Sequence, residues 1–133
     1  MPSASDYVEV QTLKHWFGLT PDSAPTTVYA ALFTSAPGDS GGGTEVTGNA
    51  YARVELDNDS TTWDLTNSTI SNKIAVTFPA PSPSAWGTVT HWALYDAASG
   101  GNLLFHAPLT NARATVAGVA LSFAIGQMTV TAD

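Results

Sequence analysis

The stretch Trp86–Leu109, WGTVTHWALYDAASGGNLLFHAPL, most constrains what this chain can fold into. Residues 88–95 combine aromatic and β-branched side chains with period-two alternation, which predicts a β-strand. A turn rich in Gly, Asn and Asp follows at 96–102, and a second strand is expected at 103–107, stopped by Pro108. Both faces of this hairpin are largely apolar. Because an isolated hairpin is only marginally stable in water, we expect other strands to cover it on both sides.

A helix is expected near the N-terminus, over residues 6–17. Asp6 is the predicted N-cap, and Glu9 three positions later completes a capping-box pattern. Gly18 and Pro21 are suited to end the helix. Its apolar residues recur at one-face spacing; they are Val10, Leu13 and Phe17, with Trp16 beside them. Because a short isolated helix is unstable in water, this stripe must dock on its own domain or on another subunit.

Further strand signals divide the rest of the chain into short segments. They are expected at 26–34, 51–56, 63–66, 73–78, 112–116, 119–124 and 127–132. Short strands separated by turn signals are typical of an antiparallel β-sandwich, jelly-roll-like, or of a partly closed barrel. We therefore predict an all-β fold with a short N-terminal α-helix, divided into a helical arm at 1–20 and a β-sandwich domain at 21–133.

The alternation within these strands also predicts the hydrophobic core. The residues expected to be mostly buried are Leu32, Phe33, Val76, Phe78, Trp92, Leu94, Leu103, Phe105, Leu121 and Phe123. Ile74 is expected to face inward with Val76 and Phe78, and Val119 with Leu121 and Phe123. Met128 and Val130 are expected to alternate inward in the last strand.

Composition excludes several classes of function. The chain has 133 residues and no cysteine, so disulfides and thiolate metal sites are excluded. Four Lys and Arg face eleven Asp and Glu, a net charge of −7, so we expect no binding to nucleic acid or to an anionic membrane surface. Charged residues make up 11% of the chain, against about 25% in typical domains. Such a neutral surface suits an ordinary β-domain or a protein packed against other subunits.

Targeting signals are not evident. The sequence contains no run of about 18 apolar residues, so a membrane span is not expected. The first residues, MPSASDYVEV, lack the basic and apolar regions of a signal peptide.

Three loop segments resemble chemical motifs but depart from them. Residues 57–61, DNDST, place oxygen atoms at alternate positions as calcium loops do, yet lack the Gly and Glu that an EF-hand needs, so a turn is the preferred interpretation. Gly41–Gly43 lacks the Lys-Ser/Thr of a phosphate-binding loop, which favours a surface loop. Asp39-Ser40-Gly41 lacks the glycine context of a nucleophile turn.

Two further sets of side chains could serve a ligand. His91 and His106 lie on paired strands and, with Asp96 or Asp64, could hold a metal ion, although strand histidines more often pack and hydrogen-bond. Trp63 and Trp86 could form a platform for a sugar ring. Our preferred expectation is a chain with no catalytic residue, no cofactor and no metal. A metal-dependent enzyme and a carbohydrate-binding module are the alternatives.

Three segments resemble a family of small virion proteins of tailed bacteriophages, described as tail-fibre-like or capsid-decoration-like. They are VYAALFTSAPGDSGGGTEVTGNAYARVEL, ISNKIAVTFPAPSPSAWGTVTHWALYDAASGGNLLFHAPLT and AGVALSFAIGQMTVTAD, in that order. The segment DNDSTTWDLTNST, between Leu56 and Ile70, departs from the family pattern.

The resemblance implies a structural part of a phage particle, made in the host bacterial cytoplasm. Capsid decoration (cement) and a tail or fibre subunit are the two positions that it leaves open. The implied partners are other virion proteins, namely the major capsid protein or tail components, and further copies of the same chain. Symmetric assemblies of small β-domains are typical of such particles.

Overall fold

Strands β2 (Thr27–Ser35), β8 (Thr88–Tyr95) and β9 (Leu103–Ala114) form the centre of the computed structural model, which describes residues 3–132. Neighbouring strands are antiparallel, and β8 lies between the other two. The sheet is completed by β1 (Ser3–Ala4), β3 (Thr44–Glu45) and β4 (Val54–Asp57). Its strand order is β1–β9–β8–β2–β3, with β4 also paired to β2. The predicted hairpin is therefore the middle of the largest sheet.

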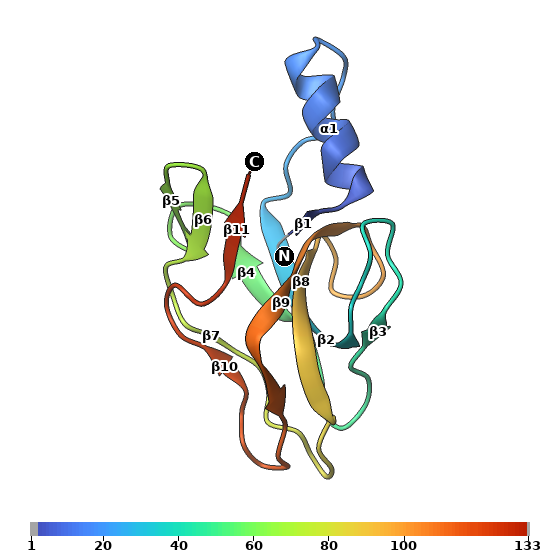
Figure 1. The fold of residues 1–133 in the computed structure, drawn as a ribbon, viewed down its shortest axis with the longest axis vertical. Coiled ribbons are helices and arrows are strands. Elements are labelled where there is room, and N and C mark those ends of the chain that lie inside the picture. Colours follow the sequence, from blue (N-terminus) through green and yellow to red (C-terminus); the bar gives the residue numbers. More distant parts are fainter. Residues whose placement is uncertain (1–2, 133) are drawn as a thin grey trace.

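Two smaller antiparallel sheets form the second layer (Figure 1). One contains β5 (Trp63–Thr66), β6 (Thr69–Asn72) and β11 (Thr129–Thr131), and the other contains β7 (Val76–Thr77) and β10 (Ser122–Phe123). Apolar side chains from both layers join one buried cluster, including Trp92 and Leu32 from the large sheet and Phe78, Phe123 and Met128 from the second layer. The architecture is the predicted antiparallel β-sandwich with a short N-terminal helix.

The large sheet is buried on both faces, as the apolar hairpin predicted. Trp92 and Leu94 face the main core between the layers. Ala31, Phe33 and Ala93 face the other way and form a second buried cluster. Tyr95 packs at the margin of this second cluster, with its ring stacked on Phe33.

A polar network led by Arg53 covers the second cluster. The Arg53 guanidinium lies 3.8 Å from the ring centroid of Tyr95. It donates to both carboxylate oxygens of Glu45 at 2.8 Å and to the carbonyls of Ala97 and Gly100 at 2.8 and 2.9 Å. Burial acts to raise the pKa of Glu45, but hydrogen bonds from Arg53 and Tyr51 outweigh it and hold the pKa below its usual value. This network ties the β8–β9 turn to the edge of the sheet.

Most of the predicted core is buried, and the exceptions lie near irregular strands. Phe105 is half-buried, whereas its neighbour Leu104 is buried in the main core. The β8–β9 pairing shifts at this point, between Leu94 and Tyr95. Ile74 and Val119 were expected to face inward, but both are exposed. They lie outside the short strands β7 and β10, where strand alternation no longer decides which way a side chain faces.

Pro108 does not end its strand, which corrects one prediction. β9 continues to Ala114 and absorbs most of the strand expected at 112–116. The β8–β9 pairing shifts between Val89 and His91, opposite Pro108. Such a bulge tolerates proline because the local ladder is already interrupted and the missing N–H leaves no partner unsatisfied.

The remaining strand predictions hold in position but not in length. The segment expected at 63–66 forms β5, β2 is offset by one residue from the segment expected at 26–34, and β11 lies within the segment expected at 127–132. The segments 51–56, 73–78 and 119–124 contain only short strands. Before β4, Asn49 and Ala50 adopt positive φ values of 50° and 68°, outside the extended region, and the strand begins only at Val54.

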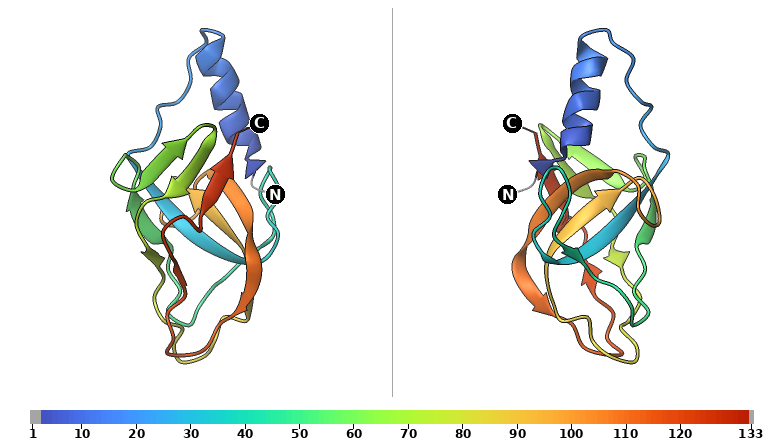
Figure 2. Two further views of the ribbon diagram at one scale, coloured as in Figure 1. Left: turned by 60° about the vertical axis from the view of Figure 1, so that its left-hand side comes forward. Right: turned by 90° about the vertical axis from the view of Figure 1, so that its right-hand side faces the viewer.

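Helix α1 (Asp6–Trp16) projects from one end of the sandwich, and the following segment runs back beside it to β2 (Figure 2). Ser5, and not Asp6, is the N-cap, because its Oγ accepts a hydrogen bond from the Val8 amide at 3.2 Å. Strand β1 falls within the predicted arm and pairs with β9. The division at residue 20 stays a prediction, and residues 1, 2 and 133 of its ranges lie outside the described residues.

The buried centre of the hairpin predicts the cost of a core substitution. Leu94→Ala should lower the free energy of unfolding by about 2–5 kcal/mol, because it removes buried apolar surface and leaves a cavity. Leu65→Ala is the matched control, since Leu65 is exposed on β5 and its loss should change stability by about 0.5 kcal/mol or less. Denaturant unfolding measures both. Equal midpoints for Leu94→Ala and wild type would contradict the central position of β8.

Candidate functional site

The helical arm is fixed to the sandwich at Ser5. The Ser5 side chain is buried and donates to the carbonyl of Leu103 at 2.5 Å, while its amide donates to the carbonyl of Leu104 at 2.9 Å. The same Oγ caps the first turn of α1 by accepting from Val8. One small side chain thus joins the helix to the central strand β9.

Asp39 forms a second attachment at the base of the arm. Its Oδ1 accepts from His106 Nε2 and from Ser3 Oγ, both at 2.8 Å, and its carbonyl accepts from the Asp6 amide at 3.0 Å. A carboxylate only accepts hydrogen bonds, so His106 carries a proton on Nε2 here. Reciprocal backbone bonds between Gly38 and Gly41 close the loop that holds Asp39 in place.

The segment that follows α1 is tied back to the helix at Asp22. Its Oδ2 accepts from the Tyr7 hydroxyl at 2.7 Å and from Gln11 Nε2 at 3.3 Å, while its amide donates to Gln11 Oε1 at 2.7 Å. Gly18 reverses the chain at the tip with a φ of 72°. These bonds hold the arm and its return segment together as a preorganised projection.

Exposed apolar residues gather on this projection. No residue of α1 is buried, and the exposed fractions reach 76% for Trp16 and 75% for Phe17. Val10, Leu13 and Leu19 are also exposed. Apolar patches of this kind on a fixed element mark interaction surfaces. The predicted stripe therefore exists, but within residues 3–132 its side chains stay exposed and are not buried against the sandwich.

A groove of about 620 Å³ lies between the arm, its return segment and the end of the sandwich. Tyr7, Gln11 and His15 line its helical side, and Leu104 and Phe105 line the sandwich side. Residues 21–25 close it along the return segment. The groove thus lies against the face of α1 that looks back to its own body.

The candidate metal ligands do not come together. Within residues 3–132, no group of three or more His, Asp or Glu side chains is placed to hold a metal ion. His91 Nδ1 pairs with Thr90 Oγ1 at 2.8 Å, and burial and the nearby His106 lower the pKa of His91. Asp96 accepts from the amide and side chain of Asn102 in the hairpin turn. Asp64 lies on β5, in the other layer, 3.9 Å from Lys73.

The acidic segment 57–61 forms a turn, as the preferred interpretation predicted in place of a calcium loop. Asp59 Oδ1 accepts from the amide and hydroxyl of Thr61 at 2.8 and 2.5 Å. Asn58 accepts from Trp63 Nε1 at 3.1 Å and donates to the carbonyl of Pro25 at 2.8 Å. The oxygen atoms that suggested a calcium loop are therefore used for local structure.

The proposed aromatic platform is wrong for Trp86. Trp86 is buried, its Nε1 donates to the carbonyl of Asn49 at 3.0 Å, and its ring meets Tyr51 edge-on. Trp63 is half-buried against the main core. The exposed tryptophan is Trp16, at the tip of the arm. The sequence pattern placed it beside an expected docked stripe and gave no signal that the helix would project.

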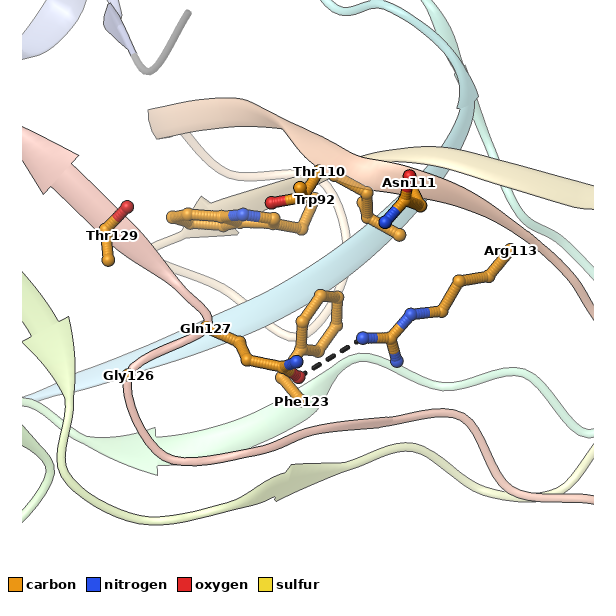
Figure 3. Close-up of a pocket in the computed structure, with 9 residues that line it drawn as sticks. Trp92, Thr110, Asn111, Arg113, Phe123, Gly126, Gln127 and Thr129 are labelled. Carbon is orange, nitrogen blue, oxygen red and sulfur yellow. Dashed lines mark hydrogen bonds between the residues drawn. The ribbon is translucent and has the colours of Figure 1, made fainter.

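A second pocket, of about 310 Å³, lies at the junction of β9 with the second layer (Figure 3). Arg113 donates to Gln127 Oε1 at 3.2 Å and to the carbonyl of Ser122, and it lies 5.0 Å from the ring centroid of Phe123. Gln127 Oε1 also accepts from the Ala124 amide. These polar groups bond to one another across the junction, so the pocket helps to join the layers.

No helix within residues 3–132 has the length and apolar character needed to cross a membrane.

The Asp39 attachment predicts a pH dependence of stability. Hydrogen bonds from His106 and then Ser3 hold the pKa of Asp39 below its ordinary value of 3.8. A carboxylate with a lowered folded-state pKa stabilises the fold above its unfolded pKa, and this stabilisation is lost as pH falls through the folded pKa. Between about pH 5 and about pH 3, the thermal midpoint of Asp39→Asn should fall less than that of wild type.

Asp64→Asn is the matched control, because that carboxylate lies in the second layer and takes no part in the attachment. It should follow the wild-type pH profile more closely than Asp39→Asn does. Identical profiles for Asp39→Asn and wild type would show that the Asp39 carboxylate does not stabilise the base of the arm.

Comparison with known proteins identifies the family. No curated protein matches this chain. A family model described as "Podophage GP4 fiber I protein gp80" matches residues 3–131, and so covers the arm as well as the sandwich. The resemblance to virion proteins of tailed phages is thereby confirmed. The chain belongs to the family of the podophage GP4 fiber I protein gp80, and it is a structural component of a phage virion.

Proposed function

We propose that this chain is a non-catalytic fibre subunit, held in the particle by protein contacts at the tip of its arm. The observation that supports this most directly is the preorganised projection with Trp16 and Leu19 exposed at its end. A fixed apolar projection loses little conformational entropy when it binds, which favours a structural contact. Synthesis in the cytoplasm of the host bacterium accords with this role.

The fibre position is preferred over capsid decoration because the matched family is described as a fibre protein. The low charge content fits either position, since both bury neutral surface against neighbours. The metal-dependent enzyme is not favoured, because His91 and His106 each bond to groups other than a shared third ligand. Trp16 leaves an exposed aromatic ring for a glycan, but the surrounding tip residues Phe17 and Leu19 are apolar and suit a protein partner.

Incorporation of tip variants into particles tests the contact. Trp16→Ser combined with Leu19→Ser should leave the isolated protein folded, because both side chains are exposed, but should reduce its amount in purified particles. Leu65→Ser combined with Ile125→Ser is the matched control, since these exposed apolar residues lie on the sandwich and should be tolerated. Normal incorporation of the tip variant would contradict the proposed contact.

Gold-labelled antibody on intact particles tests the position. Label on fibres and a low copy number per particle are expected, and label spread over the capsid would support decoration instead. Quenching of Trp fluorescence by host polysaccharide, lost in Trp16→Ser, would show that the tip binds glycans in place of protein.

A further inference from the structure

The pocket at the junction of β9 with the second layer holds a cation that no carboxylate within residues 3–132 neutralises. Arg53 pairs with Glu45 at 2.8 Å and Lys73 lies 3.9 Å from Asp64, whereas Arg113 forms no such pair in that part of the chain. None of the described Asp and Glu residues lines the pocket. In a chain with a net charge of −7, this pocket is therefore a local positive site.

The Arg113 guanidinium is held in a fixed orientation. It donates to the carbonyl of Ser122 and to Gln127 Oε1 at 3.2 Å, and it lies 5.0 Å from the ring centroid of Phe123. In Figure 3 the side chain extends from β9 into the pocket toward Gln127. A guanidinium carries five N–H groups, so these two bonds leave donors for a ligand. A fixed guanidinium matches the planar geometry of a carboxylate.

The loop beside the pocket offers no cradle of backbone amides for a phosphate. The three successive amides of residues 126–128 already donate to acceptors within the chain. Phosphate sites commonly combine such amides with positive charge. Here the charge comes from a single guanidinium, so the chemistry of the pocket favours a carboxylate over a phosphate.

Neutral polar side chains complete the pocket. Thr110 and Asn111 are exposed and Thr129 is half-buried, and their side chains form no hydrogen bond with other residues of 3–132. Each of them can both donate and accept, which suits the hydroxyl groups of a sugar. Trp92 and Phe123 are each only 2% exposed, so they form the wall of the pocket and offer no open ring face. Hydrogen bonds, and not stacking on an aromatic ring, must therefore hold a ligand here.

We infer that this pocket binds a sugar acid, with Arg113 on the carboxylate and with Thr110 and Asn111 on the ring hydroxyls. Its volume of about 310 Å³ is at the lower end for ligand sites and suits a single sugar ring. The negative charge of the whole chain repels a bare anion, so a ligand that adds hydroxyl hydrogen bonds is retained better. None of the pocket residues belongs to the arm, so the inference goes beyond the proposed function and does not depend on it.

Titration of the isolated protein with galacturonate, followed by two-dimensional NMR, tests the site. We expect weak binding, with a dissociation constant of roughly 1 mM, that shifts the side-chain amide signals of Asn111 and Gln127. Galactose lacks the carboxylate and acetate lacks the ring hydroxyls, so each should bind at least about tenfold more weakly. Acetate that binds as tightly as galacturonate would overturn the sugar, and galactose 6-phosphate that does so would overturn the preference for a carboxylate.

Removal of the guanidinium tests the role of Arg113. Arg113→Gln should weaken galacturonate binding at least about tenfold, because it removes charge-assisted hydrogen bonds to the carboxylate. Lys14→Gln is the matched control, since it removes the same charge from the arm, outside the pocket. Equal affinity for galacturonate in these two variants would overturn the site.

A second variant keeps the test independent of stability, because Arg113 also joins the two layers. Asn111 is exposed, so Asn111→Ala should keep the wild-type thermal midpoint while it weakens galacturonate binding about threefold. Unchanged binding in Asn111→Ala would contradict its contact with the ring hydroxyls.

Trigalacturonate distinguishes the two sources of a sugar acid. Binding as tight as that of galacturonate would indicate a residue within a polysaccharide, whereas loss of binding would indicate a free sugar acid. The tip variant with Trp16→Ser and Leu19→Ser should bind galacturonate as wild type does, because its changes lie on the arm. Failure of the fibre contact and failure of the sugar site are thus separate results.

Discussion

Burial of the large sheet on both faces is the constraint on which the rest of the structure depends. In β2 and β8, side chains that point in opposite directions are equally buried, among them Leu32 and Phe33, and Trp92 and Ala93. One face is covered by the second layer. The other is covered by the β8–β9 turn, which Arg53 fixes through hydrogen bonds to the Ala97 and Gly100 carbonyls. Apolar burial is non-directional, so it brings these elements together, and the guanidinium then fixes their positions. A chain with few charges places one of them where it satisfies several acceptors at once.

The arm depends on this sheet for its attachment. Ser5 and Asp39 bond to β9 or to residues beside it, and Asp22 closes the arm on itself. The apolar side chains that a self-contained domain would bury are instead left on the projection. The bonds at Ser5, Asp39 and Asp22 therefore hold these exposed apolar residues in a fixed arrangement.

The sequence allowed the sheet to be predicted, but not the position of the helix. Period-two alternation in 88–95 reports burial directly, so β8 and the double-sided cover were found. The spacing of Val10, Leu13 and Phe17 reports only that the residues share a face, and does not say whether that face meets the same chain or another. Pro108 was taken for a strand end because a bulge depends on pairing between distant residues. Ser5 was overlooked because its partner, Leu103, is far away in the sequence.

Both ends of the arm continue into strands of the large sheet, so a pulling force on the arm acts on both strands. The two strands should resist that force unequally. Its first end is β1, a strand of two residues, and its second end leads into β2, a strand of nine residues paired on both sides. Tension on the tip reaches both strands, and the short one has far fewer hydrogen bonds to resist it. β1 should therefore detach first and let the arm swing outward on β2 while the sandwich stays folded. The arm would then yield to bending at its base while the sandwich stays folded.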